Sequence, residues 1–95
     1  MNIKVHTILT LKKVIGQAEM EVSFPEGSTV AAVLHWMAEK WGEKLSSLLF
    51  EPEGGELLPR IRLMVNGRDM GFLDGMSTVL RDGDELLIMP PVAGG

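Results

Sequence analysis

The residues best suited to chemistry stand at the end of the chain, which reads Pro90-Pro91-Val92-Ala93-Gly94-Gly95 directly after an apolar run. Glycine has no Cβ, so the Gly94-Gly95 pair is slim enough to enter a narrow channel. The proline pair fixes φ at two successive positions, which predicts a short stiff stalk that holds the end away from the folded body. We therefore expect the carboxylate of Gly95 to be a reachable reactive group, with Gly94 as its slim neighbour.

A carboxylate in this setting indicates acyl chemistry. A free carboxylate is a poor acyl donor, but its conversion to an acyl-adenylate opens the carbonyl carbon to attack by a nucleophile. Sulfide or a persulfide would then give a thiocarboxylate, which is a protein-bound sulfur nucleophile. The alternative is an ordinary frayed terminus, because chain ends are often disordered.

Other candidate sites are weaker. The chain has no cysteine, so it has no thiol nucleophile, thiolate metal site or disulfide of its own. His6 and His35 fall in different elements without a paired ligand motif, and the carboxylates of Asp82, Asp84 and Glu85 favour a turn over a cation site. The glycine motifs that bind nucleotide phosphates are missing. We expect no metal, no bound cofactor and no autonomous active site, so the protein itself is not expected to be an enzyme.

Composition predicts one small domain. The 95 residues are 45% hydrophobic, which is sufficient for a modest core. A formal net charge of -4 argues against nucleic acid as a partner. No apolar stretch approaches the ~20 residues of a membrane helix, and the first residues lack the shape of a signal peptide. We expect a cytoplasmic protein with a domain over residues 1–89 and a flexible tail over residues 90–95.

Two strands and a helix are predicted in the first half of the chain. Residues 3–9 mostly alternate, with Ile3, Val5 and Leu9 on one side and Lys4 and His6 on the other, whereas Ile8 places an apolar side chain on the polar side. Residues 18–24 alternate cleanly, and residues 12–16 between the two strands suit a hairpin loop. An apolar stripe at helical spacing then predicts a helix over residues 29–41, with Ser28 as its N-cap and Gly42 at its C-terminal end.

The second half adds strands. Residues 45–49 suggest a short turn, residues 61–65 a strand ended by Asn66-Gly67, and residues 85–89 the final strand. A helix that follows a hairpin and precedes further strands packs on one face of a mixed sheet. The prediction is an α+β roll of four to five strands with one main helix on one face.

The terminal motifs resemble a known family. Arg81-Asp82-Gly83-Asp84-Glu85-Leu86, followed by the Pro90–Gly95 motif, resembles the signature of the ubiquitin-like sulfur carriers of the MoaD/ThiS family, most closely the small subunit of molybdopterin synthase. Pro25–Val30, Val65-Asn66-Gly67 and Leu80 add to this resemblance. It implies the β-grasp, or ubiquitin-like, fold, with the last strand beside the first and parallel to it in the centre of the sheet.

The resemblance also implies partners. An adenylyltransferase resembling the ubiquitin-activating enzymes would use ATP to activate Gly95, and the large subunit of molybdopterin synthase, or another sulfur-accepting enzyme, would receive the sulfur. Two features depart from the molybdopterin branch: residues 46–60 are longer, and His6-Thr7 occupies a position that is often apolar there. The open alternatives are sulfur supply for cysteine, thiamin or tRNA thiolation, a protein modifier joined through Gly95 to lysines, and a plain interaction domain.

A docking face is expected on the sheet. If Leu86 and Ile88 face the helix, Leu87 and Met89 point to the opposite side. Ile8 would join them there beside His6 and form a small apolar patch next to the tail, as is typical of a partner site. The expected partner-binding residues are Ile8, His6, Leu87, Met89, Pro90, Pro91, Val92 and Ala93.

Overall fold

The computed structural model describes residues 1–90. The expected reactive end, Gly94 and Gly95, and the expected contacts Pro91, Val92 and Ala93 lie outside the described residues. The structure describes the folded domain and the last strand, after which the terminal segment follows.

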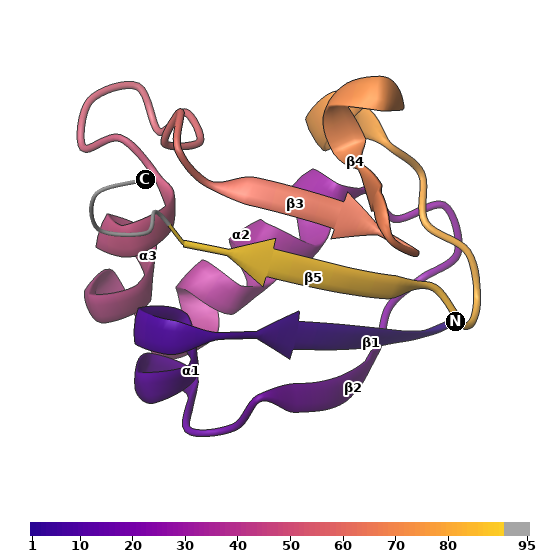
Figure 1. Cartoon of the computed structure of the whole chain (residues 1–95), viewed down its shortest axis with the longest axis horizontal. Helices are drawn as coiled ribbons and strands as arrows, with labels where there is room; N and C mark the ends of the chain where they lie inside the picture. Colours follow the sequence, from indigo (N-terminus) through magenta and orange to yellow (C-terminus); the bar gives the residue numbers. More distant parts are fainter. Residues whose placement is uncertain (91–95) are drawn as a thin grey trace.

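Five strands form one mixed sheet in the order β2-β1-β5-β3-β4. Their bounds are Asn2–Thr7 for β1, Glu19–Ser23 for β2, Arg62–Val65 for β3, Arg68–Asp69 for β4 and Glu85–Met89 for β5. The last strand, β5, lies in the middle of the sheet, parallel to β1 and antiparallel to β3 (Figure 1). The predicted pairing of the last strand with the first is confirmed.

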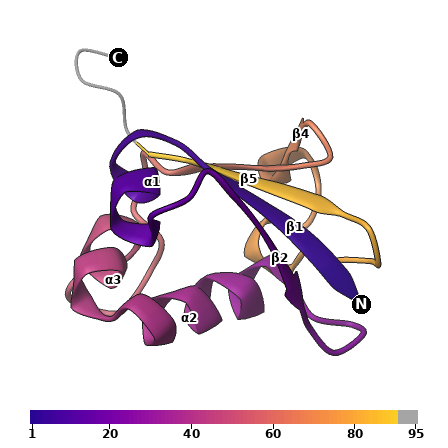
Figure 2. The ribbon, with the colours of Figure 1, turned by 90° about the horizontal axis from the view of Figure 1, so that it is seen from below.

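Three α-helices cover one face of the sheet and leave the other face open (Figure 2). They are α1 (Leu9–Ile15), α2 (Val30–Trp41) and α3 (Glu43–Leu49), and two short 3-10 turns, Met70–Phe72 and Gly75–Ser77, precede β5. The core lies between the helices and the sheet and includes Val33, Leu34 and Met37 of α2. The fold is a β-grasp.

The segment between the first two strands was expected to be a hairpin loop, but it forms helix α1. Leu11 and Ile15 are spaced one helical turn apart and are buried, so this segment contributes to the core. Gly16 ends the helix in the left-handed conformation with φ 90°. Leu9 was expected on the core side of the first strand, but it opens α1 instead and is 53% exposed.

Helix α2 begins at Val30, one residue later than expected. Thr29, rather than Ser28, is the N-cap, and its Oγ1 accepts a hydrogen bond from the Ala32 amide at 3.2 Å. The Ser28 hydroxyl instead donates to the carbonyl of Pro25. Gly42 ends the helix as expected, with φ 72°, and α3 follows at once where a short turn was expected.

The turn between β3 and β4 fixes the start of β5. Asn66 and Gly67 both have positive φ, 51° and 80°, which suits a two-residue hairpin loop. The Asn66 side-chain oxygen accepts from the Glu85 amide, and its nitrogen donates to Asp84 Oδ1, each at 2.9 Å. The predicted Asn66-Gly67 turn therefore also ties β3 to the strand that leads to the tail.

Over residues 1–90, none of the helices has the length and apolar character needed to span a membrane.

Candidate functional site at the open face of the sheet

The side chains of β5 divide between two faces. Leu86 and Ile88 are completely buried under the helices, whereas Leu87 and Met89 reach the open face and are half-buried there. This is the alternation of a strand covered on one side. It places two apolar side chains on the face that the helices leave open.

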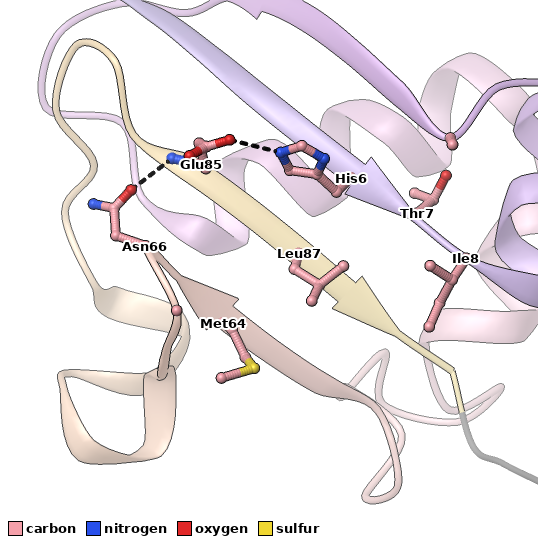
Figure 3. Close-up of a pocket in the computed structure, with 9 residues that line it drawn as sticks. His6, Thr7, Ile8, Met64, Asn66, Glu85 and Leu87 are labelled. Carbon is pink, nitrogen blue, oxygen red and sulfur yellow. Dashed lines mark hydrogen bonds and ion pairs between the residues drawn. The ribbon is translucent and has the colours of Figure 1, made fainter.

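Strand register brings further residues to Leu87. It pairs with His6 of β1 on one side and with Met64 of β3 on the other. Thr7 pairs with Ile88, so Ile8 stands level with the end of β5, and it is 38% exposed. The side chains enclose a shallow depression of about 490 Å³ (Figure 3). It is lined by His6, Thr7, Ile8, Ala18, Met64, Asn66, Gly67, Glu85 and Leu87.

One end of the depression is polar and internally paired. His6 Nε2 lies 2.9 Å from Glu85 Oε1 (Figure 3). On the other side of the ring, His6 Nδ1 lies 3.6 Å from Glu19 Oε1. Lys4 Nζ lies 3.9 Å from the same Glu19 oxygen. These groups join β5, β1 and β2 by charge and hydrogen bonding across the open face.

The other end is apolar and lies where β5 ends. Ile8, Met64 and Leu87 line this end, and Met89 follows Leu87 on the same face of β5. We call these four residues the apolar patch. The patch therefore lies at the end of β5, from which the chain continues toward Gly94 and Gly95. Pro90 is buried, so this proline does not stand off the body as part of the expected stalk.

The depression has the character of a binding surface. Its one hydroxyl among the described lining residues, Thr7 Oγ1, donates to the Gln17 carbonyl at 2.9 Å, and Thr7 itself is buried. His6 and Glu85 form a possible acid-base pair, but this hydroxyl is turned away from them (Figure 3). Within residues 1–90, no group of three His, Asp or Glu side chains is placed to hold a metal ion. The arrangement can bind a partner and present the following segment to it.

The structure brings together Ile8, His6 and Leu87 in one depression, with Met89 next along β5 on the same face. Met64, Glu85 and Asn66 were not expected among the site residues. The sequence does indicate the face of Met64: it alternates with Leu63 and Val65, which are buried, so its side chain points to the open face. Glu85 and Asn66 reach the site because strands distant in the sequence pair in the sheet. The sequence pattern alone does not predict which residues this pairing brings together.

Comparison with known proteins identifies the family of this chain and similar folds. The model of the ThiS family matches residues 8–95. Small archaeal modifier protein 3 of Haloferax volcanii is 34% identical over 95 residues, covering 100% of both chains. Sulfur carrier protein CysO of Mycobacterium tuberculosis is 33% identical over 81 residues, 84% of this chain and 83% of the relative. The structure of SAMP1 from Haloferax volcanii superimposes with a TM-score of 0.85 at 26% identity and covers 100% of both chains.

Proposed function

The chain belongs to the ThiS family of ubiquitin-like sulfur carriers, and we propose that it carries sulfur as a thiocarboxylate on Gly95. Proteins of this kind are carriers rather than enzymes. The observation that supports the proposal most directly is the extent of the family match, which runs through Gly94 to Gly95. The match therefore includes the residue to which we assign the chemistry, together with the whole of β5.

The proposed chemistry has two steps. An oxygen of the Gly95 carboxylate attacks the α-phosphorus of ATP, so that pyrophosphate leaves and an acyl-adenylate forms. The sulfur of sulfide, or of a persulfide that is then reductively cleaved, attacks the carbonyl carbon, and AMP leaves. A partner resembling the ubiquitin-activating enzymes supplies the ATP site, and we place the reaction in the cytoplasm. This chain supplies the acyl group and the surface that the partner recognises.

The open face is the proposed docking surface. The apolar patch provides contact area that a partner can desolvate, and the paired polar side chains of His6, Glu85 and Glu19 form a polar border beside it. Leu87 lies between His6 and Met64, which makes it the natural centre of the contact. A partner seated on this face would receive the following residues, Pro91 to Gly95, at a defined position.

Molybdopterin synthesis is the destination that we propose first. Its support is the resemblance of the Arg81–Leu86 and Pro90–Gly95 motifs to the small subunit of molybdopterin synthase. In this scheme the thiocarboxylate enters the large subunit and gives sulfur to the dithiolene precursor. The relative CysO is described as a sulfur carrier protein, which supports sulfur transfer without fixing the pathway. Sulfur supply for cysteine, thiamin or tRNA thiolation is therefore kept as the alternative.

The destination is testable with the thiocarboxylated protein. It is incubated with the molybdopterin synthase large subunit of the same organism and the dithiolene precursor, and its intact mass is followed. We expect a loss of ~16 Da, as sulfur is replaced by oxygen, only when both are present. Sulfur loss to a cysteine synthase with its activated serine substrate, and none to the large subunit, would move the carrier to cysteine synthesis.

A second function, protein modification, is favoured by one specific relative. Small archaeal modifier protein 3 aligns with this chain over its full length. In a modifier, a lysine amine takes the place of the sulfur nucleophile, and an isopeptide bond forms at Gly95. We expect tagged protein from its native cells to be mostly unconjugated and partly thiocarboxylated. Larger covalent species that survive boiling with thiol, with Gly-Gly remnants on partner lysines, would establish the modifier function instead.

A further inference from the structure

The outer face of α1 combines charge with an exposed apolar side chain. Leu9, Lys12, Lys13 and Gly16 follow the i, i+3, i+4, i+7 spacing of one helix face and line a shallow surface depression. Leu11 and Ile15 lie on the opposite face, within the core. We call Leu9, Lys12 and Lys13 the α1 face; it is separate from the apolar patch on the open sheet.

Leu9 has an unusual backbone. Its φ is 54°, in the left-handed region that large side chains seldom adopt. Such strain persists where the surrounding structure imposes it, and it is concentrated at binding and functional sites. Burial does not account for it here, because the Leu9 side chain is 53% exposed. The strained backbone presents an apolar side chain to the outside.

The two lysines give this face a charge opposite to that of the whole chain. Lys12 and Lys13 are exposed, and they are absent from the ion pairs formed within residues 1–90. They lie in the last turn of α1, where a positive charge favours the helix end. That role does not require an exposed Leu9 beside them. The formal charge of the chain is -4, so the α1 face is a local positive surface on an acidic protein.

The position of α1 links this face to the tail. Thr7 pairs with Ile88, and Leu9 follows Thr7 by two residues, so α1 begins level with the end of β5. Figures 1 and 2 show α1 at the same end of the molecule as the end of β5. Any protein that receives the residues after Pro90 must approach this end.

We propose that the α1 face is a second contact with the enzyme that adenylates Gly95, and that the matching surface on that enzyme is acidic with an apolar hollow for Leu9. The inference rests on the proposed function, which supplies the partner. An acidic carrier must bring a carboxylate to a site that holds the polyanion ATP. A positive surface at the root of the tail offsets that repulsion locally and orients the encounter.

The test is the kinetics of ATP–pyrophosphate exchange with the adenylating enzyme of the same organism, at several concentrations of the carrier. The variant is K12E/K13E, and the control is R68E/R81E. The control has the same change of net charge, and its exposed arginines flank the opposite end of β5. For K12E/K13E we expect the KM for the carrier to rise about tenfold with kcat unchanged, and the salt dependence of kcat/KM to weaken. The control should stay within about twofold of the wild type, because Arg68 and Arg81 lie at the opposite end of β5 from the α1 face.

Leu9→Asn separates binding from folding. Asparagine tolerates the left-handed conformation, so the Tm should stay the same or rise while the KM increases severalfold. Equal KM values for K12E/K13E and the control would overturn the proposal. Binding of the wild type to vesicles of anionic phospholipid, lost in K12E/K13E with an unchanged KM, would also overturn it. If the wild type supports no exchange at all, the proposed function fails and the inference falls with it.

Discussion

At the scale of single residues, Asn66 has the most direct control over the position of β5. It adopts a left-handed conformation and bonds to both Asp84 and Glu85. We expect Asn66→Ala to lower the free energy of unfolding by about 1–2 kcal/mol, because it loses two hydrogen bonds and a residue suited to positive φ. Urea denaturation measures this. Asn66→Gly keeps the backbone freedom and should lose less; equal losses would assign the whole effect to the hydrogen bonds.

The apolar patch gives a prediction about binding. Ile8→Asp and Met89→Asp should each leave a folded protein, since both side chains reach the open face. Each should weaken binding to the adenylating enzyme by about 2 kcal/mol if it is a central anchor, as measured by calorimetry. Ile88→Asp is the matched control: it lies on the buried side of β5 and should unfold the protein. Unfolding of the Ile8 or Met89 variant would place that residue in the core and remove the patch.

At the scale of elements, α1 converts an expected loop into part of the core. Leu11 is completely buried between this helix and the rest of the protein. Leu11→Ala should therefore destabilise the fold by about 2–4 kcal/mol through the lost burial and the cavity it leaves. The control is Leu9→Ala on the exposed face of the same helix, which should change stability far less. Similar unfolding midpoints in urea for the two variants would contradict the packing of α1.

The cap of α2 is a second test at this scale. Thr29→Ala should cost about 1 kcal/mol, because it removes the acceptor for the Ala32 amide. Ser28→Ala removes a hydroxyl that bonds outside the helix, so its effect on thermal unfolding should be smaller. A larger loss of stability for Ser28→Ala than for Thr29→Ala would show that Ser28 is the N-cap, as the sequence predicted.

Strong periodicity made some elements predictable. The stripe of α2 and the alternation of β5 are set by residues close in the chain, and both were recognised. Helix α1 was not predicted because it is short, about two turns, and because its N-cap Ile8 and its first residue Leu9 continue the apolar composition of the preceding strand. The face of Leu87 and Met89 could be predicted from alternation. Alternation also indicates the face of Met64, but not that Met64 lies beside Leu87. That neighbour, and the contact of Glu85 with His6, depend on strand register, which is a tertiary property.

At the scale of the whole molecule, the fold serves as a rigid base for the chain end. Strand β5 pairs with a neighbour on each side, and it is followed directly by Pro90 and the terminal segment. The depression and the apolar patch include side chains of this strand, and α1 begins level with its end. In the proposed function, the folded body provides recognition and Gly95 provides reactivity.

The most direct test of this account is the intact mass of the protein after incubation with ATP, its adenylating enzyme and sulfide. The wild type should gain ~16 Da, since one terminal oxygen is replaced by sulfur. A variant that lacks Gly95, or that carries one extra residue after it, should gain nothing, because even ~1 Å of misplacement can cost ~100-fold in rate. No mass gain in the wild type, or the same gain in either variant, would contradict the assignment of sulfur transfer to Gly95.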